Sequence, residues 1–176
     1  LALAAIAHSW TVFSQVIDEP AHVAAGLEWL QAGTYQLDPQ HPPLARIFVA
    51  LGPMLRGATY APLEHWLFAG NAILYGNGSY VATLASARAG TLVFFLLSCA
   101  IVFVWTRRLY GAAAATAALL FFATQPTVIA HAALATTDMA AAATIVAALF
   151  AMHAWLEEPT WWHAALLGTA VAAALT

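Results

Sequence analysis

Long apolar runs dominate the second half of the chain, and short polar breaks separate them. Residues 81–106, 112–134 and 139–156 come close to or exceed the ~20 apolar residues that a membrane-spanning helix needs. We predict a span over each of them, the second interrupted by Pro126. Residues 1–17 are predicted to end an earlier membrane helix, and residues 162–176 to form part of a further one.

Residues 18–80 have a different pattern. They hold five of the eight acidic residues, three of the seven histidines and six of the eight prolines. We therefore predict a long outer loop between spans. Residues 21–32 and 43–55 place apolar side chains at helical spacing, but each is too short to cross a bilayer. The expected fold is all-α: a polytopic transmembrane bundle with short interfacial helices in its first outer loop.

Composition supports this interpretation. Of the 176 residues 63% are hydrophobic and only 7% are charged, whereas an ordinary soluble domain is about 25% charged. A soluble enzyme, a disordered tail and a disulfide scaffold are therefore not expected. The net charge is −3, and the five basic residues, all Arg, are scattered, so no nucleic-acid partner is predicted. Because the chain begins without Met and ends within an apolar stretch, we expect a fragment of a longer protein.

Orientation follows from the short basic turn at Arg107-Arg108. The positive-inside rule places this turn in the cytoplasm. Counting spans then places residues 18–80 and 126–138 on the outer side. We expect a multi-pass integral protein, in a bacterial inner membrane, whose polar loops face outward.

Asp18 and Glu19 directly follow the first apolar run. A carboxylate at a bilayer edge is costly unless water, a cation or a partner meets it. One of the two could be a general base, or the pair could be a solvated helix end. Adjacent residues of a helix face different ways, so we expect different partners for them. His22 would lie one turn from Asp18 if Pro20 permits the turn; otherwise it is a surface or packing residue.

The segment 38–43, DPQHPP, contains three prolines in six residues. Prolines restrict the backbone, so Asp38 and His41 could be held in place for binding at little entropic cost. A stiff surface turn ahead of a helix is the alternative.

Arg88 and Asp138 lie at the outer ends of predicted spans. A buried Arg88 would need an anion, which could be Asp18, Glu19, Asp138 or a lipid phosphate, unless it extends to the interface. Asp138 could cap the helix that it begins, or join Asp18 and Glu19 on the same membrane side.

No metal-binding motif is present. His22, His41, Asp18 and Glu19 could assemble a divalent-cation site, although their spacing does not demand one.

Several strings together resemble a known family. They are DEPAH at 18–22, GLEWL at 26–30, HPPLAR at 41–46, ASAR at 85–88, RRLYG at 107–111 and ATTD at 135–138. In order and spacing they resemble the protein O-mannosyltransferase family and its bacterial relatives, multi-spanning glycosyltransferases that use lipid-phosphate sugars. The resemblance covers almost all of the chain, which would form the N-terminal part of such an enzyme.

This resemblance implies a function and a set of site residues. Asp18 and Glu19 would sit at the catalytic centre, one of them as base, with Asp138 nearby. Arg88 would contact the donor phosphate. The other substrate-binding residues expected are His22, His41 and Arg46, the last standing where relatives often have Lys. A sugar would pass from a polyprenyl-phosphate donor to an acceptor hydroxyl on a protein, lipid or glycan.

Two alternatives come from other classes. In an ion-coupled transporter the same acidic residues and Arg88 would form a charge relay. The chain could also be a purely structural membrane subunit. Transporters usually place such residues at mid-membrane, whereas here they lie at span ends, which favours an interfacial enzyme.

Overall fold

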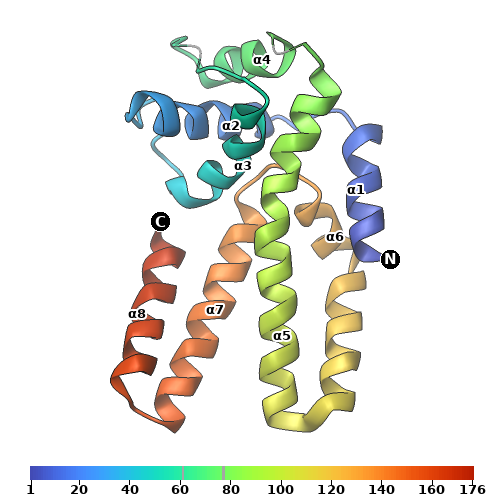
Figure 1. Cartoon of the computed structure of the whole chain (residues 1–176), viewed down its shortest axis with the longest axis vertical. Helices are drawn as coiled ribbons and strands as arrows, with labels where there is room; N and C mark the ends of the chain where they lie inside the picture. The colour runs from blue at the N-terminus through green and yellow to red at the C-terminus, as the bar shows by residue number, and fades with distance from the viewer. Residues whose placement is uncertain (61, 77) are drawn as a thin grey trace.

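The computed structural model describes residues 1–60, 62–76 and 78–176, and this part of the chain contains helices and no strand. Figure 1 shows short helices gathered at one end of a set of long ones. In chain order the elements are α1 (Ala2–Val12), α2 (Glu19–Leu27), the π-helix η1 (Glu28–Ala32), α3 (Pro43–Leu55), α4 (Trp66–Gly76), α5 (Tyr80–Thr124), α6 (Pro126–Ala132), α7 (Asp138–Glu157) and α8 (Trp161–Leu175).

The element α5 consists of two limbs that meet at Gly111, where φ is 86° and the helical geometry is interrupted. The chain reverses there and the second limb runs back beside the first (Figure 1). This reversal agrees with the turn predicted at residues 107–111. The second limb ends at Thr124, and Pro126 begins the separate helix α6, because proline is favoured in the first turn of a helix.

Two helices, α5 and α7, are long and apolar enough to cross a membrane. The 20 residues of α7 span about 30 Å at ~1.5 Å per residue, close to the thickness of a hydrocarbon core. Helices α1 and α8 are apolar but shorter. The all-helical prediction is therefore confirmed, with two candidate spans among the described helices.

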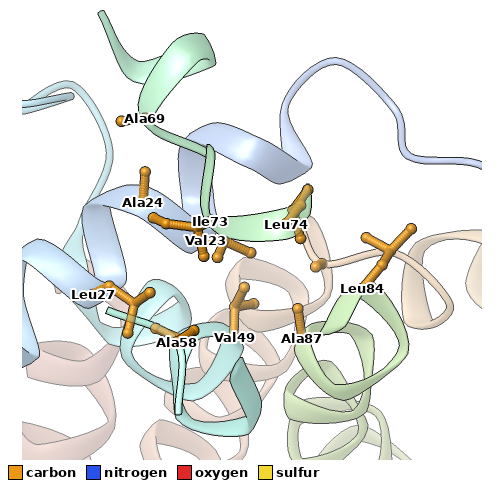
Figure 2. Close-up of a cluster of buried hydrophobic side chains, with 12 residues drawn as sticks. Val23, Ala24, Leu27, Val49, Ala58, Ala69, Ile73, Leu74, Leu84 and Ala87 are labelled. Carbon is orange, nitrogen blue, oxygen red and sulfur yellow. The ribbon is translucent and has the colours of Figure 1, made fainter. Parts of the chain in front are cut away.

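A cluster of buried side chains joins α2, α3 and α4 to the beginning of α5. Figure 2 shows that side chains from all four helices meet there, and all are less than 5% exposed. Those labelled are Val23, Ala24, Leu27, Val49, Ala58, Ala69, Ile73, Leu74, Leu84 and Ala87. This cluster fixes the elements that carry the polar side chains described below.

The outer-loop predictions were partly right. The helix predicted over 43–55 is confirmed by α3. The other piece, 21–32, was expected to lie at a surface with Glu28 on a polar side, but all of α2 is buried and Glu28 is 1% exposed. The Glu28 carboxylate accepts hydrogen bonds from the Thr34 hydroxyl and from the backbone N–H groups of Gln36 and Leu37. Helix α4 was not predicted.

The first helix is shorter than predicted. Helix α1 ends at Val12, and Phe13 is already extended, with φ −99° and ψ 134°. The carbonyls of Trp10, Phe13 and Ser14 accept hydrogen bonds from Arg88 of α5. These bonds satisfy backbone groups that the end of a helix leaves without partners, so the chain can leave the helix before residue 17.

Candidate functional site

Asp18 stands at the N-cap position of α2 and is exposed. Pro20 lies in the first turn of this helix, where its missing N–H costs nothing. The turn therefore continues, and the N–H of His22 donates to the carbonyl of Asp18 at 3.1 Å. The two residues lie one turn apart, as their spacing predicted.

His22 is 4% exposed and its Nδ1 accepts a hydrogen bond from Nε of Arg46 at 3.2 Å. Gly26, one turn after His22 in α2, explains how α2 and α3 come so close. A Cβ there would lie 2.2 Å from the carbonyl oxygen of Arg46. Burial, and then the charge of Arg46, lower the pKa of His22 from 6.5 to about 4. His22 is therefore neutral at pH 7 and carries its proton on Nε2.

Arg46 is fully buried in α3 and binds protein groups on every side. Besides His22, its guanidinium donates to the Tyr35 hydroxyl at 2.7 Å, to the Asp38 carbonyl at 2.5 Å and to the Asp38 carboxylate at 2.5 Å. Arg46 was expected to bind substrate. The structure instead makes it the support of the segment 35–38, and its contact with the cavity runs through His22 and Asp38.

His41 is held next to Asp38. Its Nδ1 lies 3.6 Å from the Asp38 carboxylate, and its backbone carbonyl accepts a hydrogen bond from the Tyr35 hydroxyl. The ring packs edge-on against His22, with 5.5 Å between centroids. The His41 side chain is nevertheless 47% exposed. The proline-rich segment leads directly into α3, so a surface turn ahead of a helix fits the structure as well as a segment that holds an accessible imidazole.

Two cavities meet at His41. The first, called here the polar cavity, has a volume of about 240 Å³ and is lined by Asp18, Ala21, His22, Leu37, Asp38, Pro39, Gln40, His41 and Trp66. The second, the apolar cavity, also of about 240 Å³, lies between the start of α3 and the helices α7 and α8. It is lined by His41, Pro42, Leu44, Ala45, Thr137, Ala140, Ala141, Thr144, Ala173, Ala174 and Thr176.

Glu19 and Arg88 form a buried ion pair, the former fully buried and the latter 1% exposed. Nε and Nη2 of Arg88 donate to the two carboxylate oxygens at 2.7 and 2.8 Å. The same oxygens accept from the N–H groups of Val16 and Ala135, each at 2.9 Å. With the three carbonyls of the α1 end, Arg88 uses all five of its N–H donors.

This pairing changes what can be expected of both residues. Of the partners considered for Arg88, the structure selects Glu19. A guanidinium whose five donors are occupied has none left for a donor phosphate, and a carboxylate that accepts four hydrogen bonds is poorly placed to take a proton from substrate. Glu19 and Arg88 instead tie the start of α2, the beginning of α5 and the 135–138 segment together.

Asp138 begins α7 and is brought to the same end of the molecule as Asp18. Its carboxylate lies 3.2 Å from Nδ1 of His131 and accepts from the Thr136 hydroxyl at 3.0 Å. The side chain is 57% exposed. Asp138 is close enough to His22 for its charge to raise the pKa of that imidazole, against the larger lowering by burial. Its position as first residue of α7 also fits the helix-end alternative.

Metal binding and comparison with known proteins add no further assignment. Among the described residues, no group of three or more His, Cys, Asp or Glu side chains is placed to hold a metal ion. Comparisons with protein-family models, curated proteins and solved structures found no match.

Sequence reasoning missed two residues of this site. Trp66 lines the polar cavity, but it lies in a stretch read as loop, and only the apolar spacing of residues 66–76 could have indicated the helix. Tyr35, which links Arg46 to the backbone of His41, carries no signal of its own in the sequence.

Proposed function

We propose that the chain forms the outward-facing catalytic end of a multi-pass membrane glycosyltransferase. The membrane part of the proposal rests on apolar surface as well as on length. Large apolar side chains remain exposed along α5, α7 and α8, among them Val93, Leu96, Leu97, Val104, Leu120, Phe121, Ile145, Leu149, Leu166 and Val171. Exposed apolar surface of this kind suits contact with lipid.

The direction of insertion follows from the two ends of the long helices. Arg107 and Arg108 lie at the turn between the limbs of α5, and α2, α3 and α4 lie at the opposite end (Figure 1). The positive-inside rule then puts the basic turn in the cytoplasm and the polar cavity on the outer face, as in a bacterial inner membrane.

The observation that carries the proposal is that His41 lines both cavities. A polyprenyl-phosphate sugar has a polar head and a long apolar tail. The polar cavity offers carboxylates and imidazoles to the head, and the adjoining apolar cavity, lined mainly by apolar residues that include alanines of α7 and α8, offers a place for the first isoprene units. A phosphate at the junction would meet His41, whose Nδ1 lies 3.6 Å from the Asp38 carboxylate.

The reaction assigns the role of base to Asp18. Its exposed carboxylate takes the proton of the acceptor hydroxyl as that oxygen attacks the anomeric carbon. The new bond joins the acceptor oxygen to the sugar, and the bond from the sugar to the phosphate oxygen breaks. The electron pair leaves with the polyprenyl phosphate, whose charge His41 stabilises. Asp138 would approach the same cavity from the second outer segment.

The transporter alternative uses the same charges in another way. A relay needs carboxylates that gain and lose protons or release their partners. The four hydrogen bonds that Glu19 accepts and the five that Arg88 donates favour a fixed anchor, which supports the enzyme over the relay.

The test is transfer by the full-length protein in its membranes. Labelled polyprenyl-phosphate sugars are added to wild type, to Asp18→Asn and to Glu64→Gln, a control that removes an exposed carboxylate outside the polar cavity. We expect label to move to an acceptor in wild type and control, and transfer to fall at least about 100-fold in Asp18→Asn. Unchanged transfer in Asp18→Asn would reject the base assignment, and ion or solute flux without a glycosyl product would favour the transporter.

A further inference from the structure

Trp66 is the aromatic side chain that lines the polar cavity together with Asp18, His22 and His41. It is the first residue of α4, and Gly70 lies one turn later on the same face of that helix. A Cβ on Gly70 would lie 2.1 Å from the carbonyl oxygen of Pro20. The glycine thus lets α4 rest directly on the first turn of α2, which holds the indole at the cavity beside Asp18.

The indole is also supported from one side. The ring of His65 stacks on it, with 5.1 Å between centroids and 30° between planes. The ring of His65 is oriented in part by a local contact, since its Nδ1 accepts a hydrogen bond from the N–H of Leu67 at 3.2 Å. Trp66 remains half-buried rather than enclosed. A rigid, partly exposed aromatic face costs little conformational entropy when a ligand packs on it.

The polar groups around the cavity are suited to hydrogen-bond the hydroxyls at the edge of a sugar ring. A pyranose has one face made largely of C–H groups, which packs against aromatic rings, and hydroxyls around its edge that need hydrogen-bond partners. Since Nδ1 of His22 is occupied by Arg46, its Nε2–H is the remaining donor, and Asp18 supplies an exposed acceptor. The volume of about 240 Å³ is below the ~300–1,000 Å³ typical of pockets for drug-sized ligands, which suits a single sugar ring.

We propose that Trp66 is the stacking platform for the sugar of the donor. Resting on the proposed function, this inference makes Trp66 a specificity-determining residue: it holds the sugar ring by its C–H face, with His22 donating to one hydroxyl and Asp18 facing the anomeric side. The polyprenyl phosphate part of the donor does not contact the indole. Loss of the indole should therefore weaken binding of the sugar-bearing carrier and spare the sugar-free carrier.

The experiment measures equilibrium binding of three radiolabelled probes to the full-length protein in detergent. They are polyprenyl-phosphate mannose, polyprenyl-phosphate glucose and sugar-free polyprenyl phosphate. The variants are Trp66→Ala, Trp66→Phe and the control Trp162→Ala, an exposed indole in the first turn of α8, outside both cavities. We expect Trp66→Ala to weaken binding of the preferred sugar-bearing probe about 3- to 10-fold, with sugar-free binding unchanged. Trp66→Phe should keep most of the affinity, and the control all of it.

Each other result has a defined meaning. Equal weakening of all three probes in Trp66→Ala would show that the indole only supports the fold, and no weakening would show that it does not touch the sugar; either overturns the inference. A wild type that binds the sugar-bearing probes no better than the sugar-free one also overturns it, while transfer could still be real. A wild type that binds none of the probes contradicts the proposed function itself.

Discussion

Replacing Arg88 should destabilise the protein more than the loss of any surface charge. In Arg88→Met the Glu19 carboxylate keeps only the N–H groups of Val16 and Ala135, and the end of α1 loses three hydrogen bonds. Leaving a buried charge without its partner costs about 3–5 kcal/mol. Both residues are at most 1% exposed, so little solvent screening reduces this figure.

Thermal or denaturant unfolding of the purified protein in detergent, followed by tryptophan fluorescence, measures this loss. Arg107→Met, at an exposed position in the turn before Gly111, is the matched control and should cost less than about 1 kcal/mol. The double variant Glu19→Gln/Arg88→Met should lose less than the sum of the two single changes, since no buried charge remains. If Arg88→Met unfolds like the control, or if the two changes simply add, the anchor described here is wrong.

Three further changes test other parts of the same end. The pKa of His22 falls from 6.5 to about 4 on folding, so between pH 4 and 6.5 the unfolded chain binds more protons than the folded one. The free energy of unfolding should therefore drop by up to about 3 kcal/mol as the pH falls from 6.5 to 4. His22→Asn should flatten this dependence in unfolding measured at pH 4–8. Gly26→Ala inserts a Cβ 2.2 Å from a backbone oxygen of α3 and should cost about 1–3 kcal/mol or more, whereas Gly168→Ala, with open space around it in α8, should be neutral or slightly stabilising in the same assay. Glu28→Gln disturbs three hydrogen bonds to residues 34–37 and should cost about 1–3 kcal/mol and speed proteolysis within that segment.

The elements that hydrophobic spacing alone determines were predicted well. The helices over 43–55 and 139–156 match α3 and α7 to within a residue at each end. Where the sequence failed, a long-range contact decides the outcome. The early end of α1 depends on Arg88, which lies more than 70 residues away along the chain, and α2 is buried on all sides because α3 and α4 both pack on it.

The candidate site, too, was predicted where local spacing decides the structure and missed where contacts between distant helices decide it. The turn that joins Asp18 and His22 followed from their spacing. The partner of Arg88 could not be chosen among three carboxylates, because spacing along a chain does not fix distances between helices. For the same reason the position of Trp66 at the polar cavity could not be predicted. It depends on the close packing of Gly70, one turn later in α4, against the carbonyl of Pro20.

The two adjacent acids at the start of α2 show how neighbouring residues of one helix can differ in role: Glu19 supports the fold, and the proposed function gives the chemistry to Asp18. Successive residues of a helix point about 100° apart, so Asp18 and Glu19 cannot share a partner. Glu19 turns inward, where Arg88 and the N–H of Ala135 make it the joint between α5 and the segment leading to Asp138. Asp18 is left facing the polar cavity, on a backbone that its neighbour holds still. A carboxylate placed in this way keeps its position without using its own oxygens for structure, which is what a general base requires.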